Sequence, residues 1–169
     1  MSINESLQLL TQVMLKVSEL YTALIECLEV ENILMTNIDT KNLLEVTQTK
    51  ELLLAEILNL DAQRKNLVFD IAQSLGTQKE MSLLELAAIA PAELKEKLGD
   101  LHKVLNLQIQ QCKNLNKQNM DLAVVSLDRI DLMKKNILGK GNNNAENYNA
   151  QGNRNPINDH GGRLLSKKA

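Results

Sequence analysis

One stretch near the N-terminus limits what this chain can fold into. Between residues 3 and 28, apolar side chains recur at alternating spacings of four and three. This is the a/d pattern of a coiled coil, held over about four heptads. The stripe consists of Ile3, Leu7, Leu10, Met14, Val17, Tyr21, Leu24 and Leu28. Additional apolar residues at Val13, Leu20, Cys27 and Leu34 widen it, so we expect this helix to contact more than one partner helix.

The core between such helices must be aliphatic. The 169 residues include no Trp, one Phe and two Tyr. Leu, Ile, Val, Met and Ala fill narrow seams between helices well, but they offer no platform on which bases could stack. The formal net charge of −2 also argues against a nucleic-acid partner, because phosphates need a basic face.

A second long helix is predicted over residues 40–75, with Asp39 as its N-cap. One face carries Leu43, Val46, Leu53, Ile57, Leu60, Leu67 and Ile71. Lys50 and Arg64 fall on the same face, where we expect their stems to cover apolar surface while their charges reach water. The alternative is one continuous helix through residues 35–42, because no Gly or Pro interrupts that segment.

Gly76 is placed to end the second helix, as a glycine after a helix commonly does. Two overlapping capping boxes follow, Thr77 with Glu80 and Ser82 with Glu85, and they introduce a short helix, "SLLELAAIA". Pro91 suits the first position of a third long helix that runs to Gly139, with Gly99 as a tolerated weak point or slight bend.

The composition changes after Leu138, where Gly and Asn dominate and apolar residues are few. Such a segment cannot offset the entropy of ordering, so we expect residues 140–169 to be a disordered tail and residues 1–139 to be the helical domain. Helices of about 35 residues are roughly 50 Å long and must pack on each other. The predicted fold is therefore all-α: an elongated antiparallel hairpin or bundle of three long helices plus a short one, with a disordered C-terminal tail.

We find no signal of catalysis, of a cofactor or of a bound metal. Cys27 and Cys112 stand alone in helical patterns and fit a helix seam. No Gly-rich phosphate loop or nucleophile elbow is present, and His160 has no second histidine near it. His102 raises the idea of a phosphotransfer bundle, but "LGDLHKVLNLQI" lacks the small residues that would expose its ring.

No secretory signal precedes the first helix, and the longest apolar run, near "LAAIA", is far shorter than the roughly 18 residues of a membrane span. The carboxylates Glu26, Glu29 and Glu31 are interpreted as solvent-facing. We therefore expect a soluble, cytoplasmic protein without an integral membrane segment.

Asn116 and Asn119 are the polar residues that packing alone does not explain. They lie three apart, close to Leu115 and Leu122, although Asn is a poor residue for a helix interior. One interpretation is that a buried Asn fixes the register between helices, as in coiled coils. The other is a polar contact with a partner protein.

Three segments together resemble the FlgN family of flagellar export chaperones over essentially the whole chain. The first is "DTKNLLEVTQTKELLLAEI" followed by "AQRKNLV". The second has the pattern of Leu115, Asn116, Asn119, Leu122, Ser126, Leu127 and Ile130. The third is the tail pattern of Tyr148, Ala150, Gly152, Gly162, Leu164, Leu165, Lys168 and Ala169.

The resemblance implies a cytoplasmic chaperone that binds the C-terminal regions of the hook–filament junction proteins and delivers them to the flagellar type III export apparatus. The expected partner-binding residues are Leu115, Asn116, Asn119, Leu122, Val125, Ser126, Ile130, Tyr148, Leu164 and Leu165. The cytoplasmic domain of the export gate is a second expected partner, and a homo-oligomer is possible. A structural coiled-coil protein without an export client is the alternative, and a phosphotransfer bundle is a further one.

Overall fold

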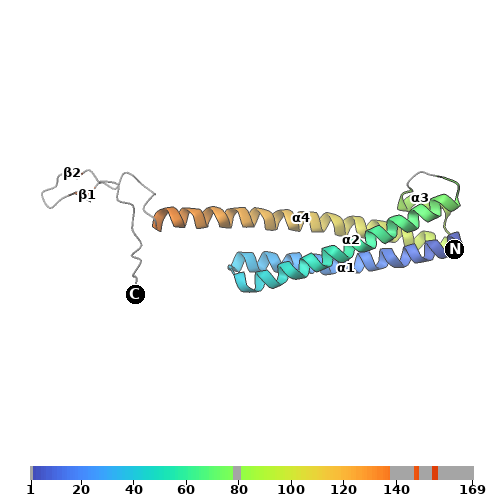
Figure 1. Cartoon of the computed structure of the whole chain (residues 1–169), viewed down its shortest axis with the longest axis horizontal. Helices are drawn as coiled ribbons and strands as arrows, with labels where there is room; N and C mark the ends of the chain where they lie inside the picture. Colours follow the sequence, from blue (N-terminus) through green and yellow to red (C-terminus); the bar gives the residue numbers. More distant parts are fainter. Residues whose placement is uncertain (1, 78–80, 138–146, 149–153, 156–169) are drawn as a thin grey trace, which may run out of the picture. The chain divides into compact units, whose positions relative to one another are not determined.

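The computed structural model of the chain describes residues 2–77, 81–137, 147–148 and 154–155. Within these ranges the chain forms four helices: α1 (Ile3–Asn37), α2 (Thr40–Ser74), α3 (Leu83–Ile89) and α4 (Ala92–Ile137) (Figure 1). Two short strands, β1 (Asn147–Tyr148) and β2 (Arg154–Asn155), pair in antiparallel fashion. The predicted helical architecture of three long helices and a short one is confirmed.

The chain divides into two compact units, Met1–Leu122 and Ala123–Ala169, and the boundary lies within α4. Our division at residues 139 and 140 separates helix from tail and stays a prediction. Apart from β1 and β2, the predicted disordered tail lies outside the described residues.

The turn between the first two helices answers the question of one helix or two. The backbone of Ile38 adopts a left-handed conformation with φ 58°, which β-branched residues rarely take. The Asp39 carboxylate then accepts a hydrogen bond from the Asn42 amide at 3.2 Å, as an N-cap does. α1 and α2 are therefore separate helices, with the predicted cap. At the other end of α1, Ser2 and Glu5 form a capping box that we did not predict from the sequence.

The connection from α2 to α4 also follows its local sequence. Gly76 has φ +72°, and the Thr77 amide donates to the Ala72 carbonyl at 3.0 Å, so α2 ends as predicted. The Ser82–Glu85 capping box is confirmed at the start of α3. The other predicted box involves Glu80, which lies outside the described residues. α4 begins at Ala92, one residue later than predicted.

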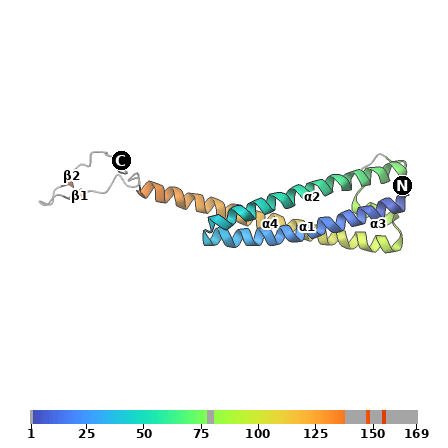
Figure 2. The same ribbon diagram turned by 60° about the horizontal axis from the view of Figure 1, so that its bottom comes forward.

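In the first unit, α1 is the helix on which the others assemble. α2 runs antiparallel to α1, whereas the first part of α4 runs in the same direction as α1 (Figures 1 and 2). One core cluster joins residues of all four helices, including Leu10, Leu60, Leu86 and Leu98. A second cluster consists of Leu24, Leu28, Ile57 and Cys112. The widened stripe of α1 therefore contacts two long helices, as predicted.

The α1 seam makes a direct prediction about stability. Leu10 is fully buried, whereas Leu15 on the same helix is 48% exposed. Leu10→Ala should lower the free energy of unfolding by about 2–5 kcal/mol, because the vacated space is only partly refilled. Leu15→Ala should change it by less than about 0.5 kcal/mol. Urea denaturation followed by circular dichroism measures both, and equal midpoints for the two variants would refute the seam.

Candidate partner-binding surfaces

A buried polar network ties the three long helices together at one level of the first unit. Glu31 of α1 is only 3% exposed and forms an ion pair with Lys50 of α2. Its other carboxylate oxygen accepts a hydrogen bond from the Asn119 amide of α4 at 2.9 Å. One side chain from each long helix therefore contributes to the network.

Asn119 uses its remaining hydrogen-bonding groups within the same network. It donates to the Leu28 carbonyl at 2.9 Å, and its side-chain oxygen accepts from Asn32 at 2.8 Å. Every buried side-chain polar atom of the described residues has a hydrogen-bond partner. The contacts of Asn119 are those expected of a buried Asn that fixes helix register. Asn116, three residues earlier, is exposed.

Two sequence-based interpretations were wrong at this network. Glu31 was expected to face solvent, but it is buried. Lys50 was expected to send its charge to water, but the charge meets the Glu31 carboxylate. The reason is positional: Glu31 continues the α1 stripe three residues after Leu28, and Lys50 lies on the α2 stripe between Val46 and Leu53. Opposite charges on two facing stripes were the signal that could have predicted this pair.

A second polar contact ties α4 to α1. Gln108 accepts a hydrogen bond from the Ser18 hydroxyl at 3.0 Å and donates to the Thr22 hydroxyl at 2.9 Å. It also donates to the Ser18 carbonyl at 3.1 Å. Together with Asn119, this contact fixes the alignment of α1 and α4 at two separate levels.

The predicted partner-binding residues lie in different environments. Leu115 is partly buried against the second core cluster, and Leu122 is also partly buried. Val125, Ser126 and Ile130 are exposed. Tyr148 lies in β1 opposite Arg154 of β2, whereas Leu164 and Leu165 lie outside the described residues.

The last part of α4 displays an apolar surface. Every side chain from Val124 to Ile137 is exposed. Four of them share one side of the helix at spacings of three or four and form what we name the C-terminal stripe: Leu127, Ile130, Met133 and Ile137. Val125 lies about 140° around the helix from Ile130, so the two do not share one face. Met133 and Ile137 were missed, although extending the spacing of three and four would have found them.

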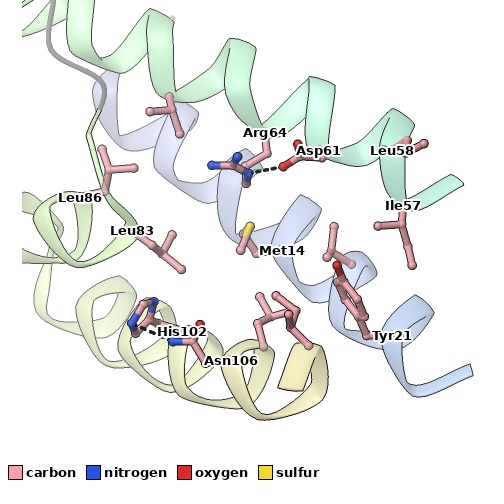
Figure 3. Close-up of a pocket in the computed structure, with 14 residues that line it drawn as sticks. Met14, Tyr21, Ile57, Leu58, Asp61, Arg64, Leu83, Leu86, His102 and Asn106 are labelled. Carbon is pink, nitrogen blue, oxygen red and sulfur yellow. Dashed lines mark hydrogen bonds and ion pairs between the residues drawn. The ribbon is translucent and has the colours of Figure 1, made fainter. Parts of the chain in front are cut away.

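The first unit also contains a groove of about 400 Å³ between α2 and α4. Figure 3 shows Ile57, Leu58 and Asp61 of α2 on one side and His102 and Asn106 of α4 on the other. Met14 and Tyr21 of α1 form the floor, and Leu83 and Leu86 close one end. Both residues come from α3, which places the short helix at that end.

The pKa values of Tyr21 and Asp61, which both line the groove, are shifted in opposite directions. Burial raises the pKa of Tyr21, and the charges of Cys112 and Asp61 raise it further. Burial also raises the pKa of Asp61, but hydrogen bonds and charge from Lys65 and Arg64 outweigh it, so that pKa is lowered. Burial raises the pKa of both thiols, Cys27 and Cys112, which keeps them protonated and unreactive.

The described residues offer no site for metal chemistry. Among them, no group of three His, Cys, Asp or Glu side chains is placed to hold a metal ion. His102 is partly buried and pairs with Asn106 at 3.0 Å. A search of the described helices for a segment able to cross a membrane also found none.

An exposed apolar stripe on a helix is a feature of proteins that bind other proteins. The family model described as FlgN protein matches residues 1–156. The chain therefore belongs to the FlgN family, a family of flagellar export chaperones. No curated protein and no solved structure matches it.

The polar network generates a second prediction. Lys50→Met leaves the buried Glu31 carboxylate without its cation, and this should lower the free energy of unfolding by about 3–5 kcal/mol. The double variant Lys50→Met, Glu31→Gln removes both charges and keeps an acceptor for Asn119. It should regain more than half of the loss. Urea denaturation at neutral pH measures both, and equal loss in the single and double variants would contradict the buried pair.

Proposed function

We propose that this protein is a cytoplasmic export chaperone for hook–filament junction proteins, which it delivers to the flagellar type III secretion apparatus. The observation that carries the proposal is the C-terminal stripe of α4. An export client that is kept partly unfolded exposes apolar helix faces, and an amphipathic helix can cover such a face without a cofactor or ATP. The client would contribute a helix from its C-terminal region.

The size of the stripe limits how much binding it can supply. Fully burying one side chain of this size gains about 1.5–3 kcal/mol. The four stripe residues are 47–68% exposed, so covering them gains roughly half of that each, or about 3–6 kcal/mol together. A micromolar complex needs about 8 kcal/mol after the cost of association. The stripe therefore needs a second contact.

Two further sets of residues can supply that contact in this proposal. Leu115, Asn116, Leu122 and Ser126 lie on α4, as the stripe does. Val125 lies on the side of α4 that carries Leu132 and is left out of the proposed surface. Tyr148, Leu164 and Leu165 lie in the C-terminal 30 residues, and a tyrosine fills an apolar pocket while its hydroxyl meets a polar partner. We propose that the C-terminal 30 residues contact the client or the cytoplasmic domain of the export gate. Asn119 is left out of the proposed surface, because its hydrogen bonds are used within the chain.

The third prediction tests the stripe with a matched control on the same helix. Ile130→Asp with Met133→Asp should weaken binding to the C-terminal segment of a junction protein at least about tenfold, since one charge in an apolar contact costs more than 1.4 kcal/mol. Leu132→Asp changes a side chain that is 59% exposed on the opposite side of α4 and should bind as the parent does. Isothermal titration calorimetry gives the affinities after circular dichroism has shown unchanged helicity. Equal affinities for the two variants would remove the stripe from consideration.

A different experiment separates the chaperone from a structural coiled-coil protein. A chaperone predicts that the chain and its client form a discrete complex, in which the stripe is covered only when the client is present. A structural protein predicts that the stripe pairs with a second copy and that no client binds. Sedimentation velocity of the chain alone and of the mixture distinguishes these outcomes.

The fourth prediction concerns the C-terminal segment. Truncation after Lys140 should leave the melting temperature nearly unchanged, because the buried residues of the described helices all lie before residue 120. The truncation, and Tyr148→Ala more selectively, should weaken binding to the junction proteins or to the export gate. If both variants bound both partners like the full chain, this segment would have no role in binding.

A further inference from the structure

We propose that the groove between α2 and α4 is a second docking site, which accepts an amphipathic helix of a partner protein that carries carboxylates along its flank facing α4. The site belongs to the first unit and is separate from the C-terminal stripe. It does not depend on the proposed export function.

The shape of the groove suits a helix. Its floor is α1 and its walls are α2 and α4, so the three long helices occupy three of the four positions of a four-helix bundle (Figure 3). The walls carry apolar side chains, including Leu58 of α2 and Ile109 of α4. Leu58 is 70% exposed, although it lines the groove. A fourth helix would cover this surface.

The same helix faces continue beyond the groove toward the turn between α1 and α2. On α2, the step from Leu58 back to Leu54 adds a side chain that is 43% exposed. On α4, the groove residues His102, Asn106 and Ile109 are followed at spacings of three or four by Lys113, Lys117 and Met120. Met120 is 67% exposed. The two helix faces therefore continue for several helical turns, with apolar side chains at Leu54 and Met120 and lysines between Ile109 and Met120 on α4, and this is the length that a docked helix needs.

The charges on the two walls select the chemistry of the partner. Lys113 and Lys117 are exposed, lie four residues apart on α4 and form no ion pair with any described residue. Asp121, four residues after Lys117, does not pair with it. By contrast, Lys97 and Lys103 of the same helix each pair with a neighbouring carboxylate. Two like charges four residues apart repel each other, and carboxylates of a docked helix would relieve this repulsion.

On the α2 wall, the cations that lie beside the groove already have a carboxylate partner. Asp61 there pairs with both Arg64 and Lys65, and Glu51, one helical turn beyond Leu54, is exposed. Carboxylates of the partner therefore find cations without an ion-pair partner among the described residues on the α4 side, at Lys113 and Lys117. Apolar burial provides the affinity, while the exposed charges select the partner and its orientation.

Two synthetic helical peptides test this proposal with the full chain. Both carry the same leucine stripe, and one flank carries Glu in the first peptide and Gln in the second. The parent protein should bind the Glu peptide about fivefold more tightly than the Gln peptide, which is the effect expected of two exposed ion pairs. Lys113→Glu with Lys117→Glu should reverse this order. The matched control, Lys16→Glu with Lys41→Glu, changes two exposed lysines of α1 and α2, away from the α4 face that carries Lys113 and Lys117, and should keep the parent's order.

A groove variant and a stripe variant complete the design. Leu58→Glu should weaken both peptides at least about tenfold, and because Leu58 is largely exposed, the variant should remain folded. Ile130→Asp with Met133→Asp should leave peptide binding unchanged, so that failure of this site and failure of the proposed client surface are distinguishable. Equal affinities of the parent for the two peptides, no measurable binding, or full binding by Leu58→Glu would each overturn the proposal.

Discussion

The ion pair between Glu31 and Lys50, together with the hydrogen bonds of Asn119, is the contact on which the alignment of the bundle depends. The seams around it are built from Leu, Ile, Val and Met, which pack almost as well after a shift of one heptad. The polar network does not tolerate such a shift, because a displaced Glu31 would be buried without its cation. The network thus fixes one alignment of the three long helices, which their aliphatic seams alone would not fix. It also marks the last buried residue of α4, since no described residue after Asn119 is buried.

This alignment connects the fold to the proposed function. The ion pair and hydrogen bonds hold α1, α2 and the first part of α4 in place, so the groove keeps its two walls and its floor without a ligand. The C-terminal stripe of α4 belongs to the second unit and is exposed along its length. A chaperone that must release its client benefits from a surface of limited area, because apolar burial of a few side chains gives binding that can be reversed. In our account, one chain therefore combines a stable scaffold with a weaker binding surface.

The sequence predicted the fold well because its signals are local. Spacings of three and four gave the α1 stripe, Asp39 gave the start of α2, and Gly76 gave its end. The prediction that Glu31 faces solvent failed because it considered the residue type and not the position of Glu31 on the α1 stripe. The sequence left open whether Asn116 and Asn119 fix helix register or contact a partner. The two residues lie three apart on one helix, and their difference in burial depends on where the neighbouring helices lie. The groove was not predictable, since its width depends on the separation of α2 and α4.

Hydrogen–deuterium exchange of the full chain, alone and with the C-terminal segment of a hook–filament junction protein, tests the central claim most directly. We expect slow exchange of the first unit around Leu28 and Cys112 in both samples, because buried core and satisfied polar contacts hold these helices. Residues 123–137 should exchange quickly in the free chain and become protected when the client binds. Protection that appeared only on α1 and α2, with residues 123–137 unchanged by the client, would contradict the account.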